Sequence, residues 1–591
     1  MDLPGRLSAA RERRAFSPPT RPPWWGVAAA AFVILVFAAV VFLLRDVAQI
    51  KRDDNAGQDA LSHLQLTQLS SRQSIQTTLG KADRELRAGS DVAHHSIWLT
   101  LVEPLPTVGP EVRSARLLTG SAARVGDLAY QAAIQARAQL DAPRAGPASR
   151  LHLIDELRRD MSTLDQQLGQ VPTTTDGHLG TTLSKAKTKL IAKLAQARTG
   201  LRNGLDLTAT LRTLLAGPKT YLLLAGNNAE MRSGGITTAA GLIHFQDGAI
   251  TTSPFVSSFD LFLPTDKAVP PPPDVEQLYG WMFPGQEWRT TDTSPNWPEV
   301  AQLYSQMSAQ SPFGKVDGVM FVDVVTLRSV LSVVGPVKTD GFTYNASNVL
   351  PQILYTNYLL YPTAESSNTR RDVQSDVARA AFDALQSRGY SLPALAQQLQ
   401  SAAKGRHLLA WSPNSDEEHM WTMLGAGGQL GADDLMVSVQ NVSASKLDFF
   451  IKPIVTIGVQ QFSDHQAVDM YVTMANPRRS VTSAYIEGGT NCCVLPGDQR
   501  VYLLFYLPAS AYNQTSYLPH FSTLGHDGPM QVAGMIYIVP YGQTTTVHIS
   551  FYLPPSQTAV TVLPSSRLTP DIYSVNGRIT VADTVPVKLP M

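Results

Sequence analysis

The chain has few cysteines and no excess of charge of either sign. Only two of its 591 residues are cysteine, and they are adjacent, so the sequence contains neither a disulfide framework nor paired CxxC metal motifs. Basic and acidic residues number 48 each, so the sequence does not have the basic excess of nucleic-acid-binding proteins. The P-loop, HExxH and GxSxG motifs are also missing. We therefore expect no nucleic-acid partner and no metal site built on such motifs.

One long apolar run, Trp24 to Leu44, carries no charge at all. Its length matches the ~20 apolar residues that a helix needs to cross a bilayer. The tail ahead of it, residues 1–23, is rich in arginine, which favours a cytoplasmic N-terminus. A cleaved signal peptide is the alternative, but its apolar core has only ~7–15 residues and ends in a cleavage site of small residues. The sequence therefore predicts a single-pass plasma-membrane protein that contacts the lipid bilayer through residues 24–44 and lies outside the membrane from Lys51 to Met591.

The hydrophobic period divides the rest of the chain into further regions. From 45 to 215, apolar residues recur three and four apart between proline-rich breaks, which predicts a helical bundle or stalk. From 216 to 400, short apolar strands alternate with helical patterns, which predicts an α/β or α+β domain. Residues 401–448 are expected to be a connecting segment. From 449 to 591, strands with alternating polarity bounded by Gly and Pro predict a β-sandwich-like domain, so the whole chain is expected to be multidomain.

A candidate ligand site follows the short apolar strand at Tyr221 to Leu224. A polar stretch that ends in two glycines comes directly after it, and such a turn behind a buried strand is the usual place for a site in an α/β domain. The same residues are also ordinary turn formers, so both interpretations stay open. The candidate residues are Asn227, Asn228, Glu230 and Arg232.

Five short segments form an ordered series outside the apolar run. They are Asn227 to Arg232 with Gly234-Gly235, Ser294 to Pro298, Val316 to Asp323 with Gly335 to Val337, Asp416 to Glu418, and Lys446 to Phe450. This series resembles the bacterial family known as domain of unknown function 4012. The resemblance implies a membrane-anchored envelope protein, associated with surface-polysaccharide assembly and without an established activity.

A second charged pattern lies near residue 370. Arg371, Asp376 and Arg379 follow the spacing Arg, four residues, Asp, two residues, Arg, and Arg370 stands beside them. Together with the segment Asp317 to Val337, this pattern resembles the LytR-CpsA-Psr phosphotransferases, which attach polyprenyl-pyrophosphate-linked glycans to the cell wall. The resemblance implies arginines that neutralise a pyrophosphate and an aspartate that holds a divalent metal or orients the attacking hydroxyl. The alternative is an ordinary helix start with surface salt bridges.

Two classes of function follow from these observations. The first is an envelope protein that assists surface-polysaccharide or cell-wall assembly by binding glycan, a lipid-linked precursor such as a polyprenyl-pyrophosphate, or partner proteins. The second is a phosphotransferase acting on a polyprenyl-pyrophosphate-linked glycan, and only this alternative calls for a divalent metal such as Mg²⁺.

Cys492 and Cys493 are the last candidates. Thiols outside the membrane meet an oxidising environment, which favours a disulfide between them. Adjacent Cα atoms lie only ~3.8 Å apart across a trans peptide, which is below the usual disulfide range and strains the bond. Two free thiols, buried as small apolar groups, are the alternative.

Overall fold

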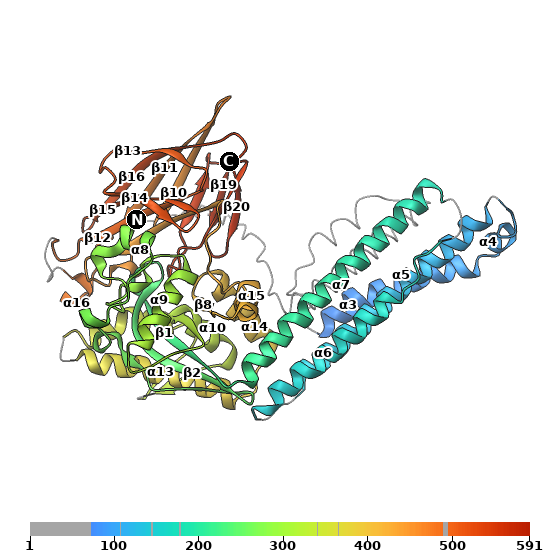
Figure 1. Ribbon diagram of the computed structural model, residues 1–591, viewed down its shortest axis with the longest axis horizontal. Coiled ribbons are helices and arrows are strands. Elements are labelled where there is room, and N and C mark those ends of the chain that lie inside the picture. Colours follow the sequence, from blue (N-terminus) through green and yellow to red (C-terminus); the bar gives the residue numbers. More distant parts are fainter. Residues whose placement is uncertain are drawn as a thin grey trace, which may run out of the picture.

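The computed structural model describes residues 72–591, except 107, 143–145, 176–178, 340, 364–365 and 489–493. In these ranges the chain forms a long helical arm and a head built on three large sheets (Figure 1). The basic tail, the apolar run Trp24–Leu44 and the pair Cys492–Cys493 lie outside the described residues, so what was expected of them stays a prediction. No helix within the described ranges combines the length and the apolar character that crossing a membrane requires.

The arm confirms the predicted helical region. Its stripes at three- and four-residue spacing face inward, so that Leu79 and Leu86 pack with Leu118 and Leu190 in one cluster. The longest helix, α7, has 36 residues, or about 54 Å at 1.5 Å per residue. The helices of the arm are α3 (Arg72–His95), α4 (Ile97–Val102), α5 (Gly109–Asp141), α6 (Ala148–Gly169) and α7 (Thr181–Ala216).

The central sheet of the head follows α7 directly. Its strand order is β3-β2-β1-β5-β8, with β4 paired to β2. Strand β1 runs parallel to β5 and antiparallel to β2, and β5 runs antiparallel to β8. The sheet is therefore mixed, in agreement with the predicted central domain. Its strands are β1 (Lys219–Met231), β2 (Gly235–Gln246), β3 (Ala249–Thr252), β4 (Val256–Ser257), β5 (Gly318–Asp323) and β8 (Leu408–Trp411).

Side chains of β1 alternate between the two faces of this sheet. Leu222 and Leu224 pack with residues of α9 (Trp297–Ala309) on one face. Tyr221 packs on the other face with the base of α7 and with Trp421 of α15 (Ser415–Met423). The other elements of this part are α8 (Pro273–Tyr279), α10 (Val324–Val334), β6 (Val337–Thr339), β7 (Phe342–Tyr344), α11 (Val349–Pro351), α12 (Asn357–Leu360), α13 (Ser367–Ser387) and α14 (Leu392–Lys404).

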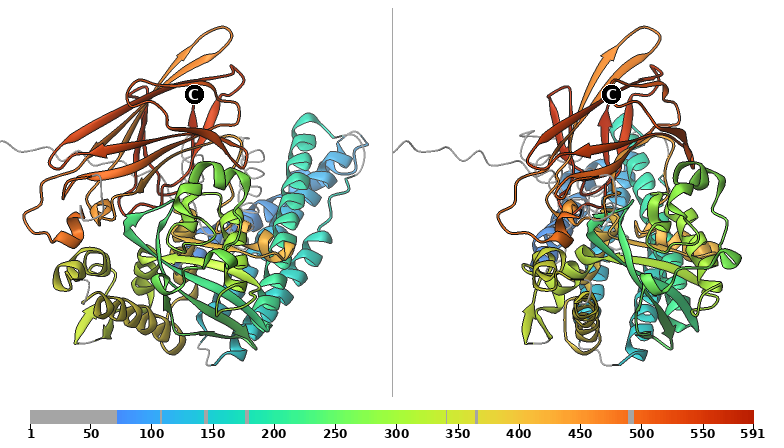
Figure 2. Two further views of the ribbon diagram at one scale, coloured as in Figure 1. Left: turned by 60° about the vertical axis from the view of Figure 1, so that its left-hand side comes forward. Right: turned by 90° about the vertical axis from the view of Figure 1, so that its left-hand side faces the viewer.

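The C-terminal part is rich in strands, as predicted. One sheet has the order β13-β16-β11-β10-β18-β19 and the other β14-β15-β12-β9-β17-β20. Val468 and Phe551 of the first sheet share a hydrophobic cluster with Val437 and Phe505 of the second. In Figure 2 these strands lie above the central sheet. The strands are β9 (Asp434–Asn441), β10 (Ile454–Gln461), β11 (Gln466–Ala475), β12 (Gln499–Leu507), β13 (Tyr512–Ser516), β14 (Thr523–Asp527), β15 (Met530–Val539), β16 (Thr544–Leu553), β17 (Ala559–Val562), β18 (Ile572–Val575), β19 (Ile579–Ala582) and β20 (Val587–Pro590). One short helix, α16 (Ala484–Glu487), lies between β11 and β12 in the sequence.

Residues 401–448 do more than connect these two parts. Strand β8 completes the central sheet, and β9 lies inside a C-terminal sheet between β12 and β17. The largest hydrophobic cluster includes residues of α10 and α13 together with both C-terminal sheets. The two parts of the head therefore share a core, and the boundary between them is an extensive interface.

Candidate functional site

Strand β1 carries the first set of predicted site residues to this interface. Its pairing with β2 becomes irregular between Asn227 and Met231, and the strand also contacts β9 and the turn at Leu447–Phe449. In the turn that follows, the Arg232 amide donates to the Gly234 carbonyl at 2.7 Å. A Cβ on Gly235 would lie 2.7 Å from the carbonyl carbon of Asn227, so only glycine allows this close approach.

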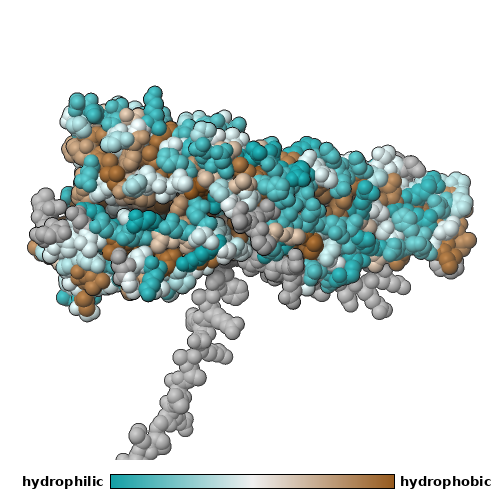
Figure 3. Space-filling model, turned by 90° about the horizontal axis from the view of Figure 1, so that it is seen from below, coloured by the Kyte–Doolittle hydropathy of each residue, from teal (hydrophilic) through white to brown (hydrophobic). Residues whose placement is uncertain are grey.

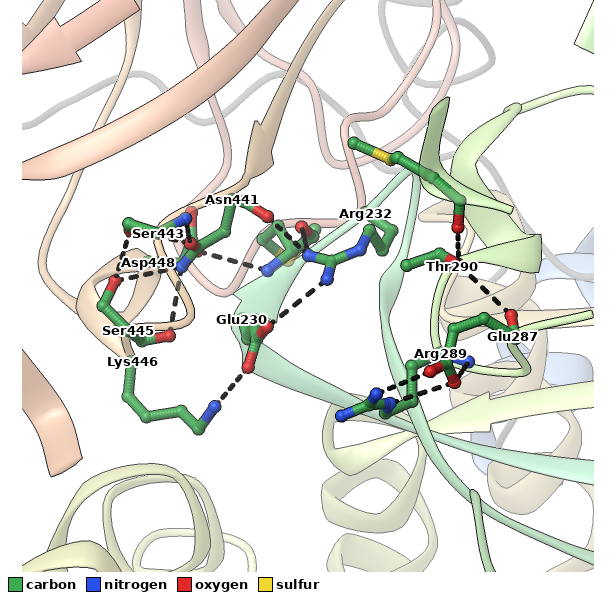
Figure 4. Close-up of polar contacts among 12 residues, drawn as sticks. Glu230, Arg232, Glu287, Arg289, Thr290, Asn441, Ser443, Ser445, Lys446 and Asp448 are labelled. Atoms are coloured by element: carbon green, nitrogen blue, oxygen red, sulfur yellow. Dashed lines mark hydrogen bonds and ion pairs between the residues drawn. The ribbon is translucent and has the colours of Figure 1, made fainter. Parts of the chain in front are cut away.

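Glu230 is the centre of a buried charge network (Figure 4). Its carboxylate forms an ion pair with Lys446 and a weaker one, at 3.4 Å, with Arg232. Arg232 also donates to the carbonyl oxygens of Asn441, at 2.6 Å, and Met231, at 3.0 Å. Burial acts to raise the pKa of Glu230, but Lys446 and Arg232 outweigh it and hold the pKa below its usual value. Glu230 is therefore an anion balanced by two buried cations.

Arg289 approaches the same carboxylate from another segment. Its guanidinium binds Glu287 with two hydrogen bonds, at 3.0 and 2.5 Å, and interacts electrostatically with Glu230. In Figure 4, Arg289 and Lys446 point toward each other from opposite sides of Glu230. The Arg289 guanidinium also lies 4.1 Å from the ring centroid of Phe259, and that of Arg371 lies 5.4 Å from the same ring. Arg289 is about one-third exposed, whereas Arg232 and Lys446 are buried.

Arg370 joins the network through aromatic rings. Its guanidinium lies 4.5 Å from the ring centroid of Tyr358 and 4.4 Å from that of Tyr485, while Nη1 donates to the carbonyl of Tyr361 at 2.9 Å. The ammonium of Lys446 approaches the same two rings, at 5.7 and 5.5 Å. Two cations therefore share two tyrosine rings, an arrangement whose attraction strengthens when water is excluded.

Asn227 and Asn228 have structural partners at the end of β1. Asn227 donates to the hydroxyl of Tyr358 at 2.8 Å, and Asn228 donates to Asp323 at 2.7 Å. Asp323 also accepts from the first turn of α10 and lies 2.6 Å from Nδ1 of His407. These asparagines thus tie β1 to the helices around it, and the carboxylate of Asp323 orients His407.

Asp292 lies beside Arg232 and is buried. One of its carboxylate oxygens accepts from Thr237 at 3.1 Å, whereas the other has no hydrogen-bond partner among the described residues. Burial, opposed only in part by Arg232, raises the pKa of Asp292 to about 7. Nε of Arg232 is also buried without a partner in the described part of the chain. The junction therefore contains a carboxyl that titrates near neutral pH next to a guanidinium with spare donor capacity.

The remaining predicted residues lie elsewhere on α13. Asp376 and Arg379 form an ion pair with each other, and the Arg379 side chain is 71% exposed. This is the surface salt bridge that the alternative interpretation of the pattern predicts. Of the four α13 residues, Arg370 belongs to the network around Glu230, and Arg371 meets it at the ring of Phe259. No group of three or more potential metal ligands occurs within the described ranges.

Sequence reasoning did not select several members of this network as site residues. Lys446 belongs to one of the five resembling segments, so that signal was present. Arg289, Tyr358 and Tyr485 stand in no motif, and only the fold brings them to Glu230. The same is true of Asp292, whose neighbours become clear only when β1 and β2 are paired.

The comparison with protein families identifies the middle of the chain. Residues 216–358 match the model of a family described as Protein of unknown function (DUF4012). The chain contains a DUF4012 domain. The match spans β1, β2 and β5 and ends at Tyr358, so it covers the predicted site residues of β1 together with Arg289 and Asp292. No curated protein and no solved structure matches the chain.

Proposed function

We propose that this DUF4012 protein is a membrane-anchored envelope protein whose junction site binds an anionic group. The site consists of Glu230, Arg232, Arg289, Arg370 and Lys446 with their partners, and the ligand has the chemistry of the pyrophosphate of a lipid-linked glycan. The apolar run Trp24–Leu44 supplies the anchor, and the head lies on the outer side of the membrane. In this role the protein holds a precursor during surface-polysaccharide or cell-wall assembly.

The balance of charge at the junction carries this proposal. Four cations, Arg232, Arg289, Arg370 and Lys446, are met there by three carboxyl groups, those of Glu230, Glu287 and Asp292, and the pKa of Asp292 is raised to about 7. Among the described residues, the partners of Arg370 are a carbonyl and two rings rather than a carboxylate. Because burying an uncompensated charge is costly, a site with surplus cations favours an anionic ligand. Guanidinium groups bind phosphate oxygens with paired hydrogen bonds, which suits a pyrophosphate.

Binding is favoured over phosphotransfer by the position of the α13 residues. The phosphotransferase alternative requires Asp376 and Arg379 at the site, with a metal such as Mg²⁺ held by the aspartate. Those two residues instead pair with each other on the exposed side of α13. Glu230 and Glu287 are engaged by cations, so these two carboxylates neutralise charge rather than act as a base for an attacking hydroxyl.

Two substitutions with opposite expected effects test the anion site. Arg289→Gln should weaken binding of farnesyl pyrophosphate by about 10-fold or more, because one charge-assisted contact is lost. Glu287→Gln should strengthen it, because Arg289 is released from its competing carboxylate. Binding is measured by calorimetry on the full chain in detergent, with inorganic pyrophosphate as the lipid-free probe.

Arg379→Gln is the matched control, since it removes an arginine of α13 that has its own partner on the surface. It should leave the affinity unchanged. Equal affinities for the wild type, Arg289→Gln and Glu287→Gln, with all proteins folded, would contradict the proposed site.

A further inference from the structure

The far end of the arm exposes an apolar surface. Among the described arm residues, five of the six exposed large hydrophobic side chains lie between Val92 and Val108, and the sixth, Ile191, lies on α7. Ile97 is 74% exposed and Leu101 is 64% exposed. Figure 3 shows the hydrophobic colour at this end of an arm that is otherwise largely hydrophilic on the face in view. We call this surface the arm tip; it consists of Val92, Ile97, Leu101, Leu105 and Val108.

The arm tip has almost no charge. Between His95 and Glu111 the only charged residue is Glu103. Its carboxylate forms an ion pair with Arg116 of α5. The same guanidinium donates to the Ala93 carbonyl at 2.9 Å and to Thr100 at 2.8 Å, so one arginine both neutralises the tip and fixes its shape. A solvent-facing segment that is apolar and has no free carboxylate is suited to the boundary between water and hydrocarbon.

The length of the chain outside the structure favours the bilayer as the occupant of this surface. Residues 45–71 separate the apolar run from the start of α3 at Arg72. These 27 residues can span up to ~90 Å when extended. The 24 residues of α3 cover only about 36 Å from Arg72 to the tip. A tip resting on the membrane is therefore within reach of the anchor on the same chain.

We propose that the arm tip inserts into the outer leaflet of the bilayer that residues 24–44 span. This inference rests on the membrane anchoring in the proposed function, but not on the anion site. With a second contact at the tip, the arm is held at two points instead of pivoting freely about one linker. The head is then kept at a fixed height and orientation above the lipid, which suits the capture of a group attached to a lipid.

The test measures the depth of the tip in proteoliposomes. The full chain, with Cys492→Ser and Cys493→Ser, is labelled with a nitrobenzoxadiazole fluorophore at Leu101→Cys or, as matched control, at Ile191→Cys. Ile191 is another exposed aliphatic residue of the same arm. We expect brominated acyl chains to quench the fluorescence of the label at position 101. We expect aqueous iodide to quench the label at position 101 about threefold less than it quenches the label at position 191. Adding Ile97→Asp to the Leu101→Cys protein should remove this difference.

Three results separate the possible failures. Protein that does not float with the vesicles contradicts the anchor, and with it the membrane part of the proposed function. Protein that floats but has equal iodide quenching at both positions overturns the tip inference alone. The label at 101 could also be protected from iodide in detergent without lipid, to a degree that depends on protein concentration. This result would assign the tip to a second copy of the chain and would also overturn the inference.

Discussion

At the scale of single residues, the sequence identifies the charged stretch of the site but not its partners. Glu230 and Arg232 could be selected because they follow a buried strand. The ion pair between Glu230 and Lys446 spans more than 200 positions of the chain and depends on how two sheets meet. Arg379 shows the opposite case, in which a suggestive spacing describes an ordinary exposed ion pair. Local pattern therefore selected Glu230 and Arg232 as candidates, and the tertiary structure shows which residues surround them.

Asp292 gives the clearest prediction at this scale. The pKa of Asp292 is about 7 in the folded chain, against ~3.9 in an unfolded one, so its contribution to the free energy of unfolding falls as pH rises from about 4 to 7. Asp292→Asn imitates the protonated form and does not titrate. We expect it to stabilise the protein at pH 8, by about 1–4 kcal/mol, and to have a much smaller effect at pH 4.

Thermal melting of both proteins across this pH range provides the measurement. Asp266→Asn serves as the control, because Asp266 is an exposed residue of the same part of the head. A stability difference between the wild type and Asp292→Asn that stays constant with pH would show that folding does not raise the pKa of Asp292.

At the scale of elements, the spacing of hydrophobic residues predicts the type of those helices and strands that bury one side. The helices of the arm follow the three- and four-residue spacing, and the C-terminal strands follow alternation, because each pattern records which side of one element is buried. The segment 401–448 was less predictable. Strand β8 has only four residues, too short for a clear period, and its place at the edge of the central sheet follows from pairing with β5.

Two glycines allow a comparison between a strand whose backbone is closely approached by another segment and a helix whose glycine has no close neighbour. Gly235→Ala should destabilise the head by about 1–3 kcal/mol, because its Cβ would press on the backbone of Asn227 in the irregular part of β1. Gly200→Ala, in helix α7, meets no atom within 4 Å and should stabilise the arm by about 0.5–1 kcal/mol. Urea denaturation followed by circular dichroism compares the two. Equal effects of the two changes would contradict the packing at the β1 bulge.

At the scale of the whole molecule, the arm and the head are joined through a shared core. Leu207 and Leu214 near the end of α7 pack in one cluster with Tyr221 of β1 and Trp421 of α15. The base of α6 adds a polar contact, in which Arg150 donates to the carbonyl of Gly248 at 2.8 Å. The sequence shows that α7 is a long amphipathic helix, but it cannot show that the last turns of this helix belong to the core of the head.

Replacing one leucine at each end of α7 tests this coupling. Leu214→Ala and Leu190→Ala both remove a fully buried side chain, and each should cost about 2–5 kcal/mol. Leu190 belongs to the cluster of the arm, so its loss should increase hydrogen exchange in the arm helices and leave β1 and α15 protected. Leu214→Ala should increase exchange in α7, β1 and α15 together, because its cluster contains residues of all three. Exchange confined to α7 in Leu214→Ala would mean that the arm opens independently of the head, and the arm could then not fix the head's orientation.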